Sequence, residues 1–226
     1  MKKELEVIGY IKTPFKDKFG VPRQSGMIEE IESTIYFLPK YRNPDALRGL
    51  EEFSHIWVLW GFCENEEKEW SPTVRPPRLG GNKKVGVFAT RSPNRPNPIG
   101  LSSLKLIAIN KDTADFSLTV SGADMVDGTP IYDIKPYIPF SDSHPEAKFG
   151  FAEKNKDYKL DVIFPEEFRI NLSKKEQENI IKILSLDPRP SYQNDSSRLY
   201  GVSLYSYNIK FQVSENILTV KDVEKM

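Results

Sequence analysis

The stretch FSHIWVLWGF, residues 53–62, decides the fold class because it is the most aromatic part of the chain. An apolar run of this length predicts a central strand buried on both faces. Working outward, strand-like apolar periodicity recurs in residues 4–11, 28–38, 85–90, 102–109, 115–122 and 131–137. Many short strands separated by Pro and Gly predict a mainly β domain, built as a closed or nearly closed barrel.

The sequence changes character after this domain. Residues 141–158 are polar, carry Pro145 and Gly150, and are typical of a linker. Ser173 and Glu176 then form a capping-box pattern that predicts a helix to about Leu186. Two alternating runs, residues 200–213 and 217–220, predict a hairpin. We therefore expect a β-barrel domain at 1–140, a linker at 141–158 and a small α+β domain at 159–226.

Composition excludes several classes of protein. Of 226 residues, 38% are hydrophobic and 28% are charged, as in a globular protein. No apolar run approaches the roughly 20 residues of a membrane-spanning helix, and the start MKKELEVIGYIK alternates like a strand rather than a signal peptide. With Cys63 the single cysteine and only two histidines, neither a disulfide nor a zinc site is expected. We expect a cytoplasmic protein without a metal or a membrane partner.

A neutral net charge conceals a cationic block. Residues 70–111 contain no Asp or Glu, yet they hold eight of the 32 basic residues: Arg75, Arg78, Lys83, Lys84, Arg91, Arg95, Lys105 and Lys111. Such a block suits a polyanion, with RNA or DNA phosphate the usual candidate. The alternative is a surface neutralised by acidic segments folded beside it.

Inside this block lies the segment VGVFATRSPNRPNPIGL, residues 85–101. Its prolines lower the entropy cost of holding Arg91, Arg95 and Asn97 in one arrangement. A stiff loop that displays guanidinium groups is typical of a binding site. The alternative is a Pro-rich connector whose arginines are simply solvated.

No nucleophile-elbow, P-loop, HExxH or GxGxxG pattern is present, so a Rossmann nucleotide site has no support. A nucleotide-like cofactor would have to bind to loops on a β scaffold. Three loops qualify: residues 22–27, 91–101 and 121–130.

The third loop, SGADMVDGTP, places Asp124 and Asp127 beside glycines that permit close backbone approach. These carboxylates could accept hydrogen bonds from ribose hydroxyls or act as a base. Alternatively, Asp127 belongs to an ordinary turn and Asp124 is an Asx cap. His55 shares a strand face with Phe53, Trp57 and Leu59, where a histidine is either structural or a catalyst.

Four strings, PRQSG, LEEFSHIWVLWGF, RPPRLGGNKKVGVFATRSPNRPNPIGLS and DMVDGTPIYDIKPY, resemble in order and spacing the TsaA-like family, whose characterised members are TrmO-type tRNA methyltransferases. LDPRPSYQ and YGVSLYSYNIKFQV are similar to that family's bacterial C-terminal domain. The resemblance implies a β-barrel, non-Rossmann methyltransferase that uses S-adenosyl-L-methionine and works as a homodimer. It implies N6-methylation of threonylcarbamoyladenosine next to the anticodon of tRNA.

The resemblance also implies site residues. Cofactor contacts map onto Arg23, Gln24, Ser25, Gly26, Met27, Glu64, Asn65, Arg91, Leu101, Ser121, Gly122, Ala123 and Asp124. For catalysis the candidate bases are Asp124, Asp127 and His55. We assign RNA binding to Arg75, Arg78, Lys83, Lys84, Arg95 and Asn97, with Tyr192, Arg198 and Tyr200 as further candidates.

Two rival interpretations remain. One is a non-enzymatic nucleic-acid-binding β module, which the cationic block supports equally well. The other is a TsaA-like methyltransferase that acts on a different substrate.

Overall fold

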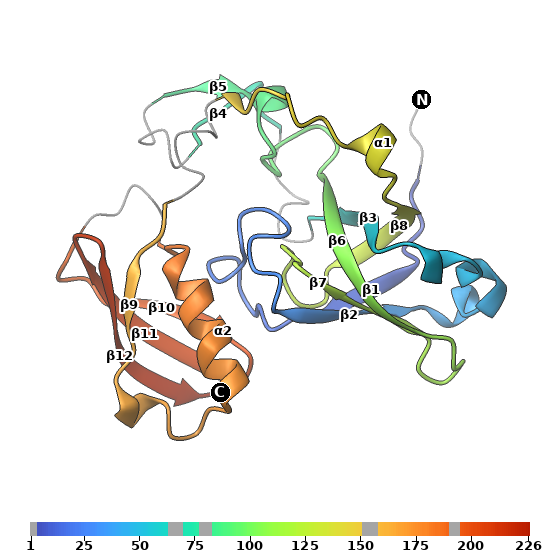
Figure 1. The fold of residues 1–226 in the computed structure, drawn as a ribbon. Coiled ribbons are helices and arrows are strands. Elements are labelled where there is room, and N and C mark those ends of the chain that lie inside the picture. The colour runs from blue at the N-terminus through green and yellow to red at the C-terminus, as the bar shows by residue number, and fades with distance from the viewer. Residues whose placement is uncertain (1–3, 63–69, 77–82, 151–157, 190–194) are drawn as a thin grey trace. The chain divides into compact units, whose positions relative to one another are not determined.

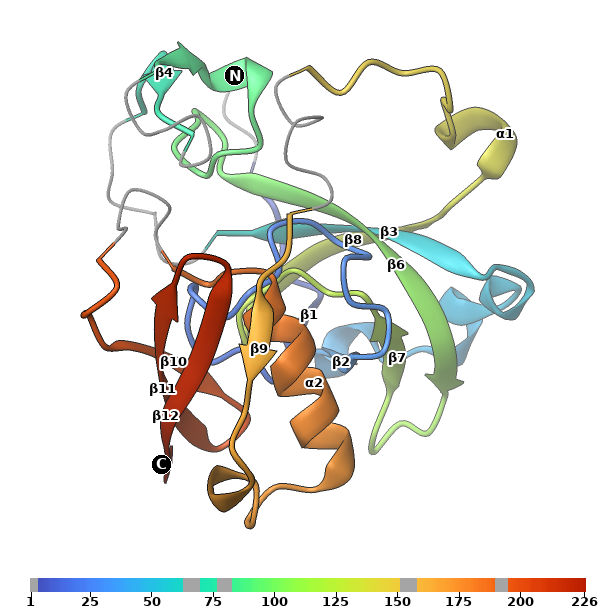
Figure 2. The same ribbon diagram turned by 60° about the vertical axis from the view of Figure 1, so that its left-hand side comes forward.

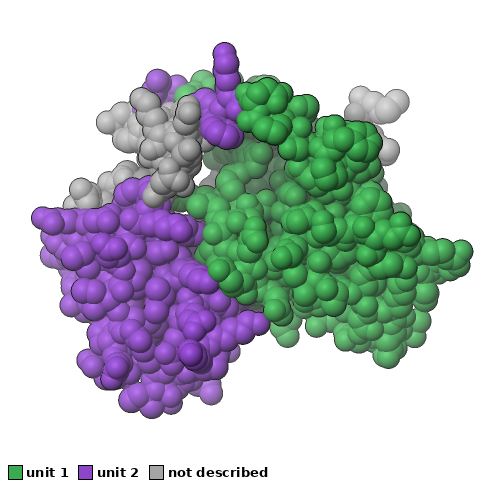
Figure 3. Space-filling model, in the orientation of Figure 1, with its two compact units in different colours: residues 1–13, 23–74, 85–146 green, residues 14–22, 75–84, 147–226 purple. Residues whose placement is uncertain are grey.

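A computed structural model describes residues 4–62, 70–76, 83–150, 158–189 and 195–226. These divide into two compact units, which are coloured separately in Figure 3. Unit 1 comprises residues 1–13, 23–74 and 85–146, and unit 2 comprises residues 14–22, 75–84 and 147–226. The predicted sites at Glu64, Asn65, Arg78 and Tyr192 lie outside the described residues.

Unit 1 is a closed antiparallel barrel, as the sequence predicts (Figure 1). Its strands follow the order β1-β2-β7-β6-β3-β8 around the barrel. Their bounds are β1 Gly9–Lys12, β2 Glu32–Phe37, β3 His55–Gly61, β6 Ile99–Asn110, β7 Ser117–Ser121 and β8 Pro130–Pro136. Closure pairs β1 with β8 and so leaves this sheet without a free edge.

Alternation along β3 separates a core face from an outer face. Ile56, Val58 and Trp60 are buried in the barrel core, whereas His55, Trp57 and Leu59 are only partly buried. The prediction that this strand is buried on both faces is therefore wrong for its outer face. His55 and Trp57 on that face line a pocket, so their side chains are not fully enclosed.

Short elements connect the barrel strands. The helix α1 spans Pro139–Asp142, and the strands β4 Thr73–Val74 and β5 Val85–Gly86 form a two-stranded sheet. The 3-10 helices are η1 Pro39–Tyr41, η2 Pro44–Leu47, η3 Leu50–Glu52 and η6 Val87–Ala89. The prediction of a strand at 85–90 is thus wrong beyond Gly86, because the chain forms the 3-10 helix η6 there, before the proline-rich loop.

Unit 2 is a small α+β fold (Figure 2). Its sheet has the order β10-β11-β12-β9, with β9 Asp161–Ile163, β10 Tyr200–Leu204, β11 Tyr207–Ser214 and β12 Ile217–Lys225. A 3-10 turn, η8 Glu166–Phe168, precedes the helix α2 Lys174–Ser185. The capping box of α2 is present as predicted, because Ser173 and Glu176 bond each other's backbone N–H.

Candidate functional site

Two of the three predicted loops are joined directly. The N–H of Gly26 donates to the carbonyl of Gly122 over 2.9 Å. Both glycines have positive φ, at 77° and 80°. A Cβ on Gly122 would lie 3.1 Å from the Cα of Gly26, so a side chain there would push the loops apart. Residues 22–27 and 121–124 therefore form one structural platform.

Asp124 sits where these loops meet β6. The hydroxyl of Ser102 donates to its Oδ1 over 2.5 Å, and Trp60 Nε1 donates to the same hydroxyl over 2.9 Å. The backbone of Ser25 lies near enough to the carboxylate to lower its pKa slightly. Burial raises the pKa of Asp124 above its ordinary value, and the bond from Ser102 and the charge of Arg91 oppose that rise.

Arg91, at the start of the proline-rich loop, reaches the first loop. Its Nη1 donates to Oε1 of Gln24, and its side chain is otherwise exposed. A guanidinium held at one nitrogen keeps further donors for an anionic ligand. All three predicted loops are thus linked within unit 1.

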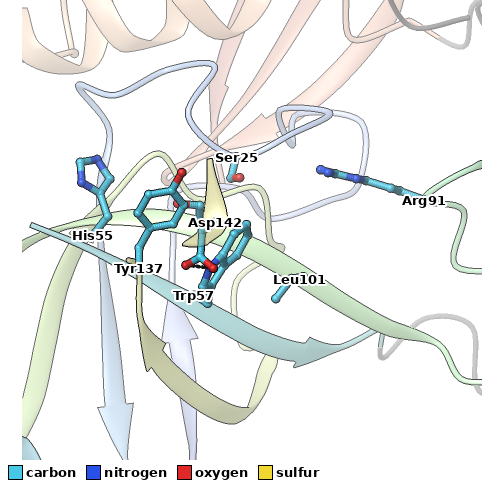
Figure 4. Close-up of a pocket in the computed structure, with 8 residues that line it drawn as sticks. Ser25, His55, Trp57, Arg91, Leu101, Tyr137 and Asp142 are labelled. Atoms are coloured by element: carbon cyan, nitrogen blue, oxygen red, sulfur yellow. Dashed lines mark hydrogen bonds between the residues drawn. The ribbon is translucent and has the colours of Figure 1, made fainter. Parts of the chain in front are cut away.

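A pocket of about 410 Å³ opens beside these loops (Figure 4). Its lining comes from the first loop, β3, the proline-rich loop, β6 and the segment after β8: Ser25, His55, Trp57, Arg91, Leu101, Ser103, Tyr137 and Asp142. Volumes of this order are typical of small-molecule and nucleotide sites. Three residues predicted to bind the cofactor, Ser25, Arg91 and Leu101, line this pocket together with the candidate base His55.

The three proposed bases lie in different surroundings. Asp124 accepts from Ser102, whereas Asp127 accepts the N–H of Thr13 over 2.9 Å and fixes the loop to the end of β1. Neither Asp124 nor Asp127 is part of the pocket lining. His55 lines the pocket, and its Nδ1 lies 2.9 Å from the Ser54 hydroxyl.

The predicted RNA-binding residues also divide. Arg75, Lys83, Lys84 and Asn97 are exposed. Arg95 is half-buried, and its Nη2 donates to the carbonyls of Thr90 and Val87 over 2.8 and 3.2 Å. Arg95 therefore closes the proline-rich loop on itself and has fewer donors left for a phosphate.

The loop residues have the chemistry that S-adenosyl-L-methionine requires. Its carboxylate needs a cation such as Arg91, and its ammonium or ribose hydroxyls need an anionic acceptor such as Asp124. A Cβ on Gly26 would meet nothing within 4 Å, so the backbone there faces open space. Ser121 has a buried hydroxyl without a hydrogen-bond partner among the described residues. The residues fit the cofactor.

Sequence reasoning missed several residues of the site. Ser102 and Trp60 support Asp124, while Tyr137 and Asp142 complete the pocket. Strand alternation correctly placed Trp57 on the same face as His55, and both residues line the pocket. The contacts of Ser102 depend on the pairing of β3 with β6, which no local pattern specifies.

Neither a metal cluster nor a membrane span is found in the parts of the chain that the structure describes. Within them, no three His, Cys, Asp or Glu side chains come together in a way that could hold a metal ion. Over the same residues, every helix is too short or too polar to cross a bilayer.

Comparisons with known proteins agree with this architecture. Residues 10–143 match the tRNA-methyltransferase O N-terminal domain and residues 157–226 match the TrmO C-terminal domain. The chain is 41% identical to the tRNA (adenine(37)-N6)-methyltransferase of Escherichia coli K12, covering 94% of each chain. A crystal structure of TrmO from Pseudomonas aeruginosa is 32% identical and superposes with a TM-score of 0.79, covering 100% of this chain and 98% of that one. The chain belongs to the TrmO family of tRNA methyltransferases.

Proposed function

We propose that this protein transfers a methyl group from S-adenosyl-L-methionine to N6 of adenosine 37 in tRNA, with threonylcarbamoyladenosine as the acceptor. The Escherichia coli relative, named for methylation of adenine 37, spans nearly the whole chain. A second relative, from Pseudomonas aeruginosa, is named as a putative S-adenosylmethionine-dependent methyltransferase and is 37% identical over 99% of this chain. The observation that carries the proposal is the convergence of Ser25, Arg91 and Leu101 on one pocket beside Asp124.

The chain's own residues bind and align the reactants. When bound, S-adenosyl-L-methionine supplies an activated methyl group on a sulfonium. Arg91 holds the carboxylate of its methionine part, and the Gly26–Gly122 platform supports it through backbone groups. Alignment of this kind lowers the barrier by up to roughly 7–11 kcal/mol, which accounts for a site without a catalytic triad.

Asp124 takes the proton that the acceptor nitrogen loses. A urea-like nitrogen is a poor nucleophile, and a carboxylate with a raised pKa is a stronger base than an ordinary one. The bond from Ser102 to Oδ1 fixes the orientation of the carboxylate. His55, which lines the pocket, is the second candidate, and Asp127 is the third because it is engaged with Thr13.

Substitution distinguishes these bases. We expect Asp124→Asn to lower kcat by about 10²–10⁴-fold, with a smaller effect from His55→Gln or Asp127→Asn. Methylation is followed with purified tRNA, and cofactor affinity by calorimetry. A wild-type rate for Asp124→Asn with unchanged cofactor affinity contradicts the assignment.

The exposed basic residues Arg75, Lys83 and Lys84 bind tRNA phosphates, as do Arg78 and Asn97 in our proposal. Phosphate contacts position an RNA without reading its sequence. Each lost contact reduces the slope of log K against log[salt] by about 0.7–0.9. The double variant Lys83→Ala/Lys84→Ala should therefore bind tRNA more weakly and with a flatter salt dependence, and an unchanged slope argues against this patch.

We also propose a cytoplasmic homodimer. A dimer would show as twice the chain mass of 26.0 kDa in light scattering, and a monomer at working concentration contradicts it.

Mass spectrometry of tRNA nucleosides tests the function itself. Purified protein with S-adenosyl-L-methionine should methylate tRNA that carries threonylcarbamoyladenosine. Transcripts with unmodified adenosine 37 serve as the control for the acceptor. Absence of the methylated nucleoside, both in this reaction and in a comparison of strains with and without the gene, contradicts the proposal.

A further inference from the structure

One wall of the pocket is aromatic and has no role in the donor site proposed above. It is formed by Trp57 on β3, Tyr137 after β8 and Asp142 in α1 (Figure 4). The rings of Trp57 and Tyr137 are 5.5 Å apart and tilted by 45°. Both side chains are only partly buried, although large aromatic residues in a barrel domain usually bury their rings.

The orientation of Trp57 is fixed at the edge of its ring. Its Nε1 donates to Oδ2 of Asp142 over 2.8 Å, and the same oxygen accepts the N–H of Ile138 over 2.9 Å. These two bonds hold the pKa of Asp142 below its ordinary value, and the bond from Ile138 has the larger effect. The carboxylate is thus ionised at neutral pH and anchors the edge of the indole.

The wall lies in the same pocket as the loops assigned to the donor. Ser25 and Arg91 line the pocket together with Trp57 and Tyr137. A planar ligand stacked on this wall would therefore be placed beside the donor loops. A nucleobase is a ligand of this kind, because it has planar, apolar faces and polar edges.

We propose that Trp57 and Tyr137 form the stacking wall for the acceptor adenine of the tRNA, splayed out of the anticodon loop. This inference rests on the proposed function and adds the location of the acceptor. Proteins read single-stranded RNA loops by stacking unstacked bases on aromatic side chains. Asp142 acts as a positioning residue that holds Trp57 in its orientation.

Trp57→Ala tests the wall. Loss of base stacking weakens RNA binding by about 5- to 150-fold, so KM for tRNA should rise by that factor while the affinity for S-adenosyl-L-methionine stays within about twofold. Trp57→Phe keeps an aromatic face and should recover most of the loss. Leu59→Ala is the matched control, because Leu59 lies on the same face of β3 and is also partly buried but does not line the pocket.

A binding cycle makes the test independent of catalysis. Affinities of wild type and Trp57→Ala are measured by fluorescence polarisation, in the presence of S-adenosylhomocysteine, for an anticodon stem-loop with threonylcarbamoyladenosine or with an abasic site at the acceptor position. Wild type should bind the abasic RNA more weakly than the RNA with the base. Trp57→Ala should bind the two RNAs with nearly equal affinity, because its stacking surface is already lost. Tyr137→Ala repeats the cycle in case Trp57→Ala does not fold.

Other outcomes overturn the inference in distinguishable ways. Additive losses in the cycle show that the base does not contact Trp57. A drop in cofactor affinity alone assigns the wall to the adenine of the donor, and dissociation of a dimer assigns it to a second copy of the chain. If wild type binds both RNAs equally and methylates neither, the proposed function fails with it. Stacking without methylation leaves the wall supported and contradicts only the reaction.

Discussion

Asp124 illustrates how a buried carboxyl can work against the stability of its fold. Burial raises the pKa of its carboxyl, so the folded protein binds this proton more tightly than the unfolded chain does. Stability therefore falls as the pH rises from about 3.9, the unfolded value, to the folded pKa, and the penalty then stays constant. This loss of stability arises because the charged carboxylate gives up its water on folding. Arg91 and the bound cofactor would compensate for that charge.

We expect Asp124→Asn to raise the melting temperature of the cofactor-free protein at pH 8. The gain should shrink as the pH falls through the folded pKa, because the wild-type carboxyl then binds its proton as well. Calorimetry at pH 8 and at successively lower pH values measures the difference. Glu29→Gln, which removes an exposed carboxyl, is the control. A lower melting temperature for Asp124→Asn at pH 8 contradicts this account.

Ser102 is the residue that connects Asp124 to the barrel core. Its hydroxyl accepts from Trp60 and donates to Asp124, so Ser102→Ala leaves a buried indole N–H without its acceptor. We expect a loss of about 1–3 kcal/mol in the free energy of unfolding. Because the Ser102 bond lowers the pKa of Asp124, its removal should also move the acidic limb of the pH–rate profile to higher pH.

Urea denaturation and the pH dependence of methylation measure these two effects. Ser33→Ala is the matched control, since Ser33 is a buried barrel serine whose hydroxyl has no hydrogen-bond partner among the described residues. Equal losses for the two serine variants, together with an unmoved pH profile, argue that Ser102 only fills space.

At the scale of elements, Gly100 sets how closely β6 approaches β3. Gly100 pairs with Trp60, and a Cβ on Gly100 would lie 2.1 Å from the Trp60 indole. That indole is buried and hydrogen-bonded, so it cannot move aside easily. The glycine therefore permits the indole to reach Ser102.

Gly100→Ala should destabilise the barrel by about 1–3 kcal/mol or more, the typical cost of overpacking. Thermal unfolding measures the loss. Gly86→Ala is the control, because a Cβ at Gly86 meets nothing within 4 Å and its φ of −59° suits any residue. If the two variants unfold at the same temperature, the barrel accommodates a side chain at Gly100 and this reading of the contact is wrong.

Strand periodicity predicts the barrel well because its strands alternate between core and surface. The strand predicted at 131–137 is observed at 130–136, and the helix predicted after Ser173 is observed at 174–185. By contrast, the run at 200–213 divides into β10 and β11 at Tyr205, whose φ is 56°. A non-glycine residue at positive φ gives no turn signal, so periodicity alone could not find that turn.

The site itself is predictable only in part for a similar reason. Ser25, Arg91 and Leu101 were expected from motifs, and the structure brings them to one pocket. The contacts of Trp57 with Asp142 and of Trp60 with Ser102 depend on strand order and register, which are properties of the whole barrel.

At the scale of the whole molecule, chain order and structural units do not coincide. Residues 14–22 precede most of the barrel in sequence but belong to unit 2. The N–H of Lys16 donates to Ser203 over 3.2 Å, and Asp17 Oδ2 accepts the N–H of Ser203 over 2.8 Å. The loop 23–27 of unit 1 follows this segment directly. The chain therefore passes from unit 1 into unit 2 near Thr13 and returns near Pro22, directly before the loop 23–27.

Phe15 is a core residue of the segment 14–22. It is fully buried and forms a β-bridge with Leu204. We expect Phe15→Ala to cost about 3–5 kcal/mol in the unfolding of unit 2, the usual cost for a buried phenylalanine. Hydrogen exchange of the β10 and β11 amides, read together with urea denaturation, measures it. Phe19→Ala, in the same segment but 45% exposed, is the matched control.

Equal exchange rates for the two variants would show that unit 2 is complete without residues 14–22. Faster exchange in Phe15→Ala alone would show that the small domain needs a segment from the N-terminal side of the barrel, so that a fragment starting at residue 147 would lack part of its core.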